Sequence, residues 1–139
     1  MAFLKSSSLC TGLSDICLSQ LISAAALVEL SPGEVVVEEG GVDQALYIVV
    51  EGQLGVRKGS GGNVVELAKL GRSAVFGESA ALTQHPRSAT VITELDARLI
   101  RIPGETVRAV ADEAPKLGRR LAALMAGRSK DTEVKLTRP

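Results

Sequence analysis

Two side chains of opposite charge stand nine residues apart in the stretch FGESAALTQHPRSATV, residues 76–91. Glu78 follows a Phe-Gly pair, and Arg87 follows a proline. A glycine that ends a strand and opens a short helical turn leaves backbone N–H groups without intrahelical partners, and such groups bind anions. An arginine adds a fixed cation whose paired N–H donors suit a phosphate. The stretch therefore predicts a binding site for a small anionic ligand.

The carboxylate needs an explanation of its own, because Glu78 would repel a phosphate placed beside it. A ligand hydroxyl that donates to the carboxylate provides one, and a sugar phosphate carries both groups. Since Glu78 and Arg87 lie on either side of a turn, both can face one pocket. The alternative is that the two side chains form a structural ion pair in a surface loop.

The elements that must position these residues are mainly β. Ser14 is suited to cap a helix whose apolar residues continue to Ala25, and a Ser-Pro-Gly turn at 31–33 follows. Short apolar runs separated by glycine-rich turns then predict a sandwich or barrel of about eight strands. The strands expected from these runs cover residues 35–37, 46–50, 54–57, 64–67, 89–93 and 97–102, with a hairpin tip at 59–63.

The last third of the chain is predicted to be helical, with one helix at 103–112 and another that begins near Pro115. Its apolar residues fall at helical spacing, and Gly127 is expected to end the helix. The apolar stripe consists of Leu117, Leu121, Leu124 and Met125. The fold class expected is an eight-stranded β-roll or jelly-roll barrel with one N-terminal helix and two C-terminal helices. Its segments are an N-terminal helical segment at 1–30, the roll at 31–102, the C-terminal helices at 103–128 and a tail at 129–139.

Composition narrows the function classes. A chain of 139 residues with 45% hydrophobic and 23% charged residues is expected to form a single domain. Aromatic residues make up 2%, which argues against a stacking platform for single-stranded nucleic acid. With one histidine, we expect no catalytic residues, no metal site and no enzyme. The absence of a long apolar run predicts no membrane span and no signal peptide, and hence a cytoplasmic protein.

Charge and cysteines add two further expectations. Residues 1–100 carry 7 basic and 11 acidic side chains, whereas residues 101–139 carry 9 basic and 5 acidic ones. A basic C-terminal end can contact an acidic partner, although a solvated helix and tail is the commoner reason for such a stretch. Cys10 and Cys17 lie seven residues apart, which is neither a zinc spacing nor a disulfide framework, so both are expected to be reduced and partly buried thiols.

The ordered set of motifs resembles cyclic-nucleotide-binding domains of the bacterial channel type and of the protein-kinase-A regulatory type. In this family the stretch at 76–91 corresponds to the phosphate-binding cassette. The segments SPGEVVVEEGGVDQALYIVVEGQLGV, ELAKLGRSAVFGE and DEAPKLGRRLAALM resemble the first strands, the entry into the cassette and the final helix of the family. The resemblance covers the chain from the N-terminal helix to about Arg128.

The resemblance implies a role for each matching residue. Glu78 would accept a hydrogen bond from the ribose 2′-hydroxyl, and Arg87 would pair with the phosphate. Ser88 would add a hydroxyl near the phosphate or near a guanine amino group, and Val56 would lie against the base. Gly77 and the backbone amides of Glu78, Ser79 and Ala80 would hold the phosphate and the ribose, while Leu124, Met125 or Arg128 would close over the base.

The function expected from the resemblance is that of a regulatory sensor that binds a 3′,5′-cyclic nucleotide without a prosthetic group, with cAMP favoured and cGMP possible. Binding would be transmitted through the last helix to an effector domain or partner protein. No helix-turn-helix follows that helix, so DNA binding is not expected. The alternative is a non-catalytic scaffold or dimerisation module with an empty pocket.

Overall fold

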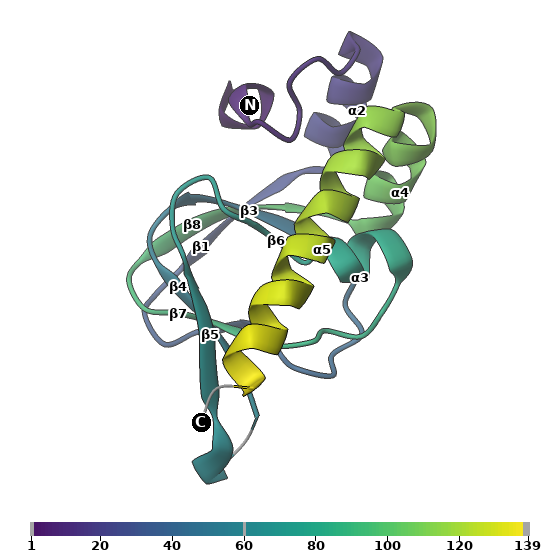
Figure 1. The fold of residues 1–139 in the computed structure, drawn as a ribbon. Coiled ribbons are helices and arrows are strands. Elements are labelled where there is room, and N and C mark those ends of the chain that lie inside the picture. Colours follow the sequence, from purple (N-terminus) through teal and green to yellow (C-terminus); the bar gives the residue numbers. More distant parts are fainter. Residues whose placement is uncertain (1, 60, 138–139) are drawn as a thin grey trace.

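Two antiparallel sheets form a β-roll, and the helices gather along one side of it (Figure 1). The computed structural model describes the backbone of residues 2–59 and 61–137, with side chains up to residue 126. The strands are β1 Ala26–Leu30, β2 Val35–Val37, β3 Leu46–Glu51, β4 Leu54–Lys58, β5 Val65–Leu70, β6 Val75–Phe76, β7 Thr90–Thr93 and β8 Ala97–Ile102. The helices are α1 Ala2–Ser6, α2 Asp15–Ala24, α3 Glu78–Thr83, α4 Gly104–Glu113 and α5 Pro115–Thr137, with a 3₁₀ turn at Gly61–Asn63.

The strands divide equally between two sheets, in the orders β1-β8-β3-β6 and β2-β7-β4-β5. The predicted fold class is therefore confirmed: the described residues contain eight strands arranged as a roll, with helices at both ends of the sequence. The second sheet holds the hairpin β4-β5, whose tip is the predicted glycine-rich turn.

The N-terminal region differs from the sequence expectation at its end. Ser14 caps α2 as predicted, because its Oγ accepts a hydrogen bond of 3.2 Å from the backbone N–H of Cys17. Residues 26–30, assigned from sequence to the N-terminal helical segment, form strand β1 instead. The chain becomes extended at Ala25, and all five residues that follow pair in register with β8. Pairing with the neighbouring strand thus ends the helical segment before residue 30, where the sequence had placed its end.

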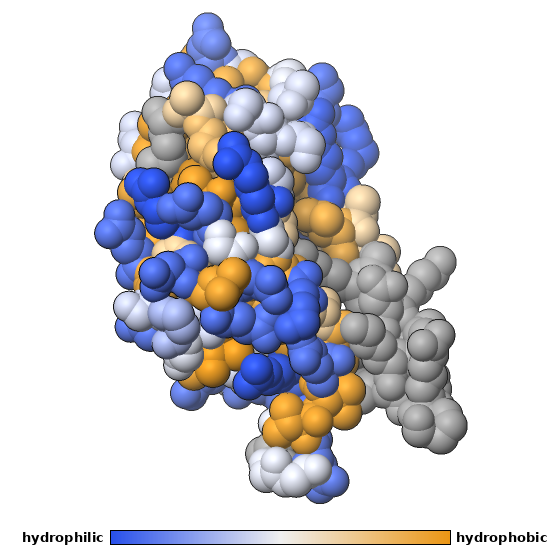
Figure 2. Space-filling model, turned by 90° about the vertical axis from the view of Figure 1, so that its left-hand side faces the viewer, coloured by the Kyte–Doolittle hydropathy of each residue, from blue (hydrophilic) through white to orange (hydrophobic). Residues whose placement is uncertain are grey.

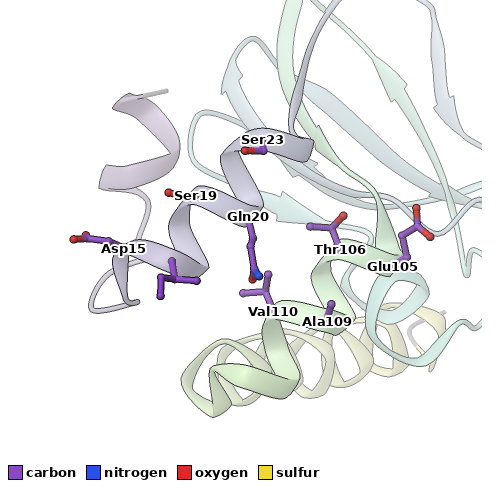
Figure 3. Close-up of a pocket in the computed structure, with 9 residues that line it drawn as sticks. Asp15, Ser19, Gln20, Ser23, Glu105, Thr106, Ala109 and Val110 are labelled. Carbon is purple, nitrogen blue, oxygen red and sulfur yellow. The ribbon is translucent and has the colours of Figure 1, made fainter.

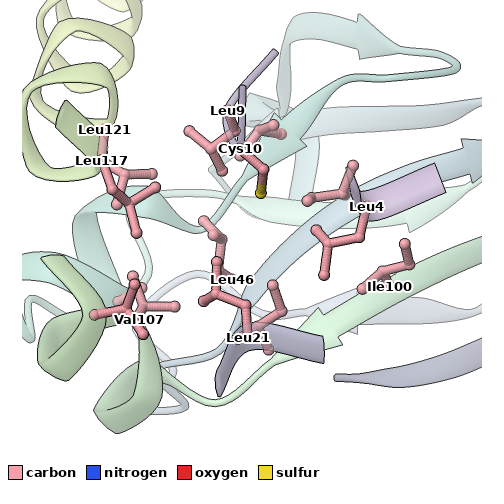
Figure 4. Close-up of a cluster of buried hydrophobic side chains, with 14 of the residues drawn as sticks. Leu4, Leu9, Cys10, Leu21, Leu46, Ile100, Val107, Leu117 and Leu121 are labelled. Carbon is pink, nitrogen blue, oxygen red and sulfur yellow. The ribbon is translucent and has the colours of Figure 1, made fainter. Parts of the chain in front are cut away.

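Strands β3 and β8 separate two hydrophobic cores, because their side chains alternate between the two faces of the sheet. Leu46 and Ile48 point into a core shared with the helices, whereas Tyr47 and Val49 point into the interior of the roll. Figure 4 shows the helical core, in which α4 and α5 pack against β3, β8 and the N-terminal segment. Its labelled members are Leu4, Leu9, Cys10, Leu21, Leu46, Ile100, Val107, Leu117 and Leu121.

Helix α5 is longer than the sequence suggested. Its backbone continues through Gly127, the residue expected to end the helix, as far as Thr137. A single glycine costs a helix only about 1 kcal/mol relative to alanine, so it does not by itself terminate a helix that neighbouring residues support. Leu117 and Leu121 are buried in the helical core, which agrees with the predicted apolar stripe.

The surface of the described part of the chain is mixed. Figure 2 shows one face on which hydrophilic side chains predominate and apolar ones lie between them in separate groups. None of the helices in the residues described is both long enough and apolar enough to cross a membrane.

Burial also determines the chemistry of the two thiols. Cys10 and Cys17 are unpaired and buried in the helical core, more deeply than the sequence suggested. Burial raises the pKa of Cys10 to about 11, although the nearby charge of Arg120 opposes the shift. The thiolate, which is the reactive form, is therefore scarce near neutral pH.

We expect both cysteines to be inert toward an aromatic disulfide reagent at about pH 8 in the native protein. Both should react once urea unfolds the chain, because unfolding exposes the two thiols. Unfolding also removes the burial that raises the pKa of Cys10 in the native protein. The aromatic thiolate that the reagent releases on reaction with a cysteine is measured by its absorbance. Rapid release from the native protein would contradict the burial of the thiols.

Candidate functional site

A left-handed glycine begins the site. Gly77 has a φ of 86° and forms the N-cap of α3, directly after strand β6. A Cβ atom built on Gly77 would lie 2.6 Å from the carbonyl oxygen of Ala45 and 2.5 Å from Nη1 of Arg87. Only glycine satisfies both the backbone conformation and the close approach of these two groups. Gly77 therefore allows Arg87 to lie against the start of the helix.

The backbone of Arg87 is fixed by the glycine pair that follows β2. Its carbonyl accepts a hydrogen bond of 2.7 Å from the N–H of Gly40, and its N–H donates one of 2.8 Å to the carbonyl of Gly41. These two bonds join the chain just before β7 to the turn at 40–41. They place the side chain of Arg87 beneath α3, where only 6% of the residue is exposed.

The guanidinium of Arg87 is held from one side. Its Nη2 donates to Oδ2 of Asp43 at 3.0 Å and to the carbonyl oxygen of Ala45 at 2.8 Å. Its central carbon lies 5.9 Å from the centre of the Tyr47 ring, within the range of a cation–π contact. The carboxylate, the carbonyl and the ring together fix the orientation of the cation.

The remaining nitrogens of Arg87 are buried without a described partner. Neither Nε nor Nη1 makes a hydrogen bond to any described residue. These two atoms carry three of the five N–H donors of a guanidinium. Buried donors of a charged group are rarely left unpaired, because the loss of hydration is costly. The arrangement is therefore suited to an anionic acceptor.

Asp43 is the ion-pair partner that the sequence analysis missed. Burial tends to raise its pKa, but the hydrogen bond from Arg87 and the charges of Arg87 and Arg101 outweigh burial and lower it below the ordinary value. Arg101 approaches its other carboxylate oxygen at 3.3 Å. Asp43 is thus ionised and shared by two arginines. The sequence alternative that paired Arg87 with Glu78 gave the wrong acidic partner.

A cavity of about 580 Å³ lies beside Arg87, between the roll, α3 and α5. Its volume is that of a typical small-molecule site. Eight of the residues predicted from sequence line it, namely Val56, Gly77, Glu78, Ser79, Ala80, Arg87, Ser88 and Met125. The apolar walls and floor are formed by Val37, Leu67, Ala68, Leu70, Phe76, Val91 and Met125.

The three side chains considered as lids have different positions. Met125, on α5, lines the cavity, whereas Leu124 packs against the helical core. The side chain of Arg128 lies outside the described residues. Glu78 is 4% exposed and occupies the first position of α3, where a carboxylate is favoured by the helix dipole.

Sequence reasoning missed the residues that support Arg87 from behind, namely Asp43, Ala45 and Tyr47. Asp43 and Ala45 lie in an irregular segment between β2 and β3, so no periodicity marks their direction. Tyr47 could have been found from the alternation of β3, which places it on the same face as Val49, toward the interior of the roll.

A second cavity, of about 800 Å³, lies between α2 and α4 (Figure 3). The charged side chains that line it are Asp15 and Glu105, and none of its nine described lining residues is basic. An anionic ligand would find no counter-charge there. The smaller cavity at Arg87 is therefore the candidate site. Among the described residues, no group of three or more His, Cys, Asp or Glu side chains gathers to hold a metal.

Comparison with known proteins found a matching family model and several relatives. Residues 27–114 match the family model of the cyclic nucleotide-binding domain. A cyclic AMP receptor protein from Thermus thermophilus is 32% identical over 105 residues, which cover 75% of this chain and 49% of the relative. A cAMP-dependent protein kinase regulatory subunit from Mycosarcoma maydis is 39% identical over 88 residues, which cover 57% of this chain and 17% of the relative.

Among solved structures, the catabolite activator protein of Thermus thermophilus has a TM-score of 0.78 and 29% identity, covering 94% of this chain and 62% of that chain. The chain spans half or less of the length of its curated relatives. It covers 7% of a lysophospholipase nte1 from Aspergillus oryzae, to which it is 29% identical over 105 residues, or 75% of this chain.

We expect Gly77→Ala to destabilise the protein more than Gly33→Ala does. Gly33 also has a positive φ, 85°, but nothing lies within 4 Å of its added Cβ atom. The matched control thus carries backbone strain alone, of about 1–3 kcal/mol, whereas Gly77→Ala adds overlap with Ala45 and Arg87. The free energy of unfolding in urea measures the difference. Equal losses would show that the close approach at Gly77 is unimportant.

Proposed function

The chain belongs to the cyclic nucleotide-binding domain family, and we propose that the cavity beside Arg87 binds a 3′,5′-cyclic nucleotide, cAMP in preference to cGMP. The observation that carries the proposal is the buried cation of Arg87, whose Nε and Nη1 have no described acceptor. The chain acts in this proposal as a regulatory sensor rather than as an enzyme.

The cyclic phosphate is the part of the ligand that Arg87 recognises. The Nε and Nη1 donors supply charged hydrogen bonds, and Asp43 keeps the guanidinium in place from the opposite side. Gly77 leaves room for the phosphate to approach the backbone amides of Glu78, Ser79 and Ala80. A phosphate in this place would accept hydrogen bonds from the buried donors that have no acceptor among the described residues.

The ribose is the part of the ligand that Glu78 recognises. Its 2′-hydroxyl is the only ribose hydroxyl left free in a 3′,5′-cyclic nucleotide, and it can donate to the carboxylate. Glu78 is buried in the cavity wall, so a hydrogen bond there is shielded from water.

The base occupies the apolar part of the cavity. Val56 lies on β4, Leu67 and Ala68 lie on β5, and Met125 approaches from α5. These side chains carry no hydrogen-bonding group that would select guanine. The absence of such a group favours adenine over guanine. The hydroxyl of Ser88 is the one feature of the predicted set that would permit a guanine contact.

Helix α5 transmits the binding event. It contributes Met125 to the cavity while Leu117 and Leu121 pack in the helical core, so one helix contacts both regions. A ligand that contacts Met125 favours the position of α5 in which this contact forms. The effector domain or partner protein is then the one that α5 and α4 contact. If the ligand binds one position of α5 a hundredfold more tightly than the other, it shifts the equilibrium between the two positions by only about 2.7 kcal/mol.

Isothermal titration with cAMP tests the proposal. Arg87→Ala should weaken binding by about 2–5 kcal/mol, because it removes the charge that pairs with a desolvated phosphate. Arg98→Ala, at an exposed arginine of β8, is the control and should bind within about twofold of the native protein. If neither cAMP nor cGMP binds, the proposal fails and an empty scaffold domain is the better interpretation. A loss below about tenfold in Arg87→Ala would remove its phosphate role.

The ribose contact has its own test. Glu78→Gln should weaken binding of cAMP but leave binding of 2′-deoxy-cAMP nearly unchanged, since the deoxy ligand lacks the hydroxyl that the carboxylate accepts. Glu105→Gln, at an exposed glutamate of α4, serves as the matched control and should affect neither ligand. If native protein binds the two ligands equally well, Glu78 does not contact the ribose.

A further inference from the structure

We propose that Arg108 of α4 is a positioning residue that sets the geometry of the phosphate site without touching the ligand. This inference rests on the proposed function and deepens it. We define the phosphate cradle as Gly77 and α3 on one side and residues 43–45 with Arg87 on the other. Arg108 contacts both halves of the cradle from behind.

The first contact is with the segment that holds Arg87. Residues 43–45 have no regular secondary structure, so contacts with other elements must fix their position. Successive residues of the segment contact different arginines. Asp43 and Ala45 accept hydrogen bonds from Arg87. Between them, Oε1 of Gln44 accepts a hydrogen bond of 3.0 Å from Nη1 of Arg108. The segment is thus held between the ligand-binding arginine and α4.

The first residue of α4 lies in close contact with the same segment. A Cβ atom added to Gly104 would overlap the carbonyl oxygen of Gln44 and lie 2.9 Å from its Cβ atom. The backbone of Gln44 therefore rests directly on the first residue of α4. Any displacement of α4 is transmitted to residues 43–45, and through them to the orientation of Arg87.

The second contact is with α3. The same Nη1 of Arg108 donates a hydrogen bond of 2.9 Å to the carbonyl oxygen of Ala81. The last carbonyl groups of a helix lack intrahelical partners, and a cation near them is favoured by the helix dipole. Arg108 therefore holds the end of α3 opposite to the one that faces the cavity.

One nitrogen atom thus connects the two halves of the cradle. Both described acceptors, the Gln44 side chain and the Ala81 carbonyl, are uncharged, so these contacts do not neutralise Arg108 as an ion pair would. Hydrogen bonds from a charged donor are stronger than neutral ones. Arg108 can therefore fix the distance between α3 and Arg87, and with it the fit of a phosphate.

The first test compares two arginines that make similar contacts in different places. Arg108→Met keeps much of the aliphatic stem but removes both hydrogen bonds. Arg120→Met is the matched control, because Nη1 of Arg120 donates to the carbonyl of Leu9 at 2.8 Å, on the N-terminal segment. We expect cAMP affinity to fall about tenfold in Arg108→Met and to remain unchanged in Arg120→Met. An unchanged affinity in Arg108→Met would overturn the inference.

A double-mutant cycle separates positioning from general destabilisation. In an Arg87→Lys background the paired donors that Arg108 orients are already lost, so adding Arg108→Met should weaken cAMP binding by less than about twofold. A purely structural role would lower affinity by the same factor in both backgrounds. That result would overturn the inference even if Arg108→Met alone binds poorly.

The third measurement needs no ligand, and so it distinguishes failure of this inference from failure of the proposed function. The Nε–H of Arg87 gives its own ¹⁵N–¹H signal, which depends on the orientation of the guanidinium. Arg108→Met should shift or broaden that signal in the ligand-free protein, and Arg120→Met should leave it in place. An unmoved Arg87 signal in Arg108→Met would exclude the positioning role, whether or not cAMP binds.

Discussion

A buried arginine that is held on one side only is the feature on which the rest of the site depends. Asp43, Ala45 and the ring of Tyr47 fix the guanidinium of Arg87, while its Nε and Nη1 remain without described acceptors. Burying such a cation is unfavourable unless its donors are used. The left-handed Gly77, which has no Cβ atom, allows the backbone to lie close to that cation. The turn at 40–41 holds the backbone of Arg87 through two hydrogen bonds.

The two-sided sheet explains how a change at this cation can reach the helices. On strand β3, Tyr47 points toward Arg87 and Leu46 points into the helical core. Adjacent residues of one strand therefore contact the site and the helices. Residues 43–45 lie immediately before this strand and contact both Arg87 and α4. The site and the helices are therefore connected through strand β3 and through the hydrogen bonds of residues 43–45.

Much of this was accessible from the sequence because it depends on local rules. Alternating apolar runs and glycine-rich turns predicted the roll, and the cap at Ser14 predicted the start of α2. Local rules also failed where packing competes with them. Residues 26–30 were assigned to the N-terminal helical segment but pair with β8. Gly127 lies within the backbone of α5 because one glycine does not outweigh the rest of a helix.

The sequence by itself determined the candidate residues of the site: a glycine, an acid and an arginine, at a spacing that lets them face one cavity. Only the tertiary structure decided which carboxylate pairs with Arg87, since Asp43 lies 44 residues away and in a segment without periodicity. It also brought Arg108 of α4 into hydrogen-bond contact with Gln44 and Ala81. Such contacts between distant segments follow from how sheets and helices pack, and no local pattern of residue types encodes them.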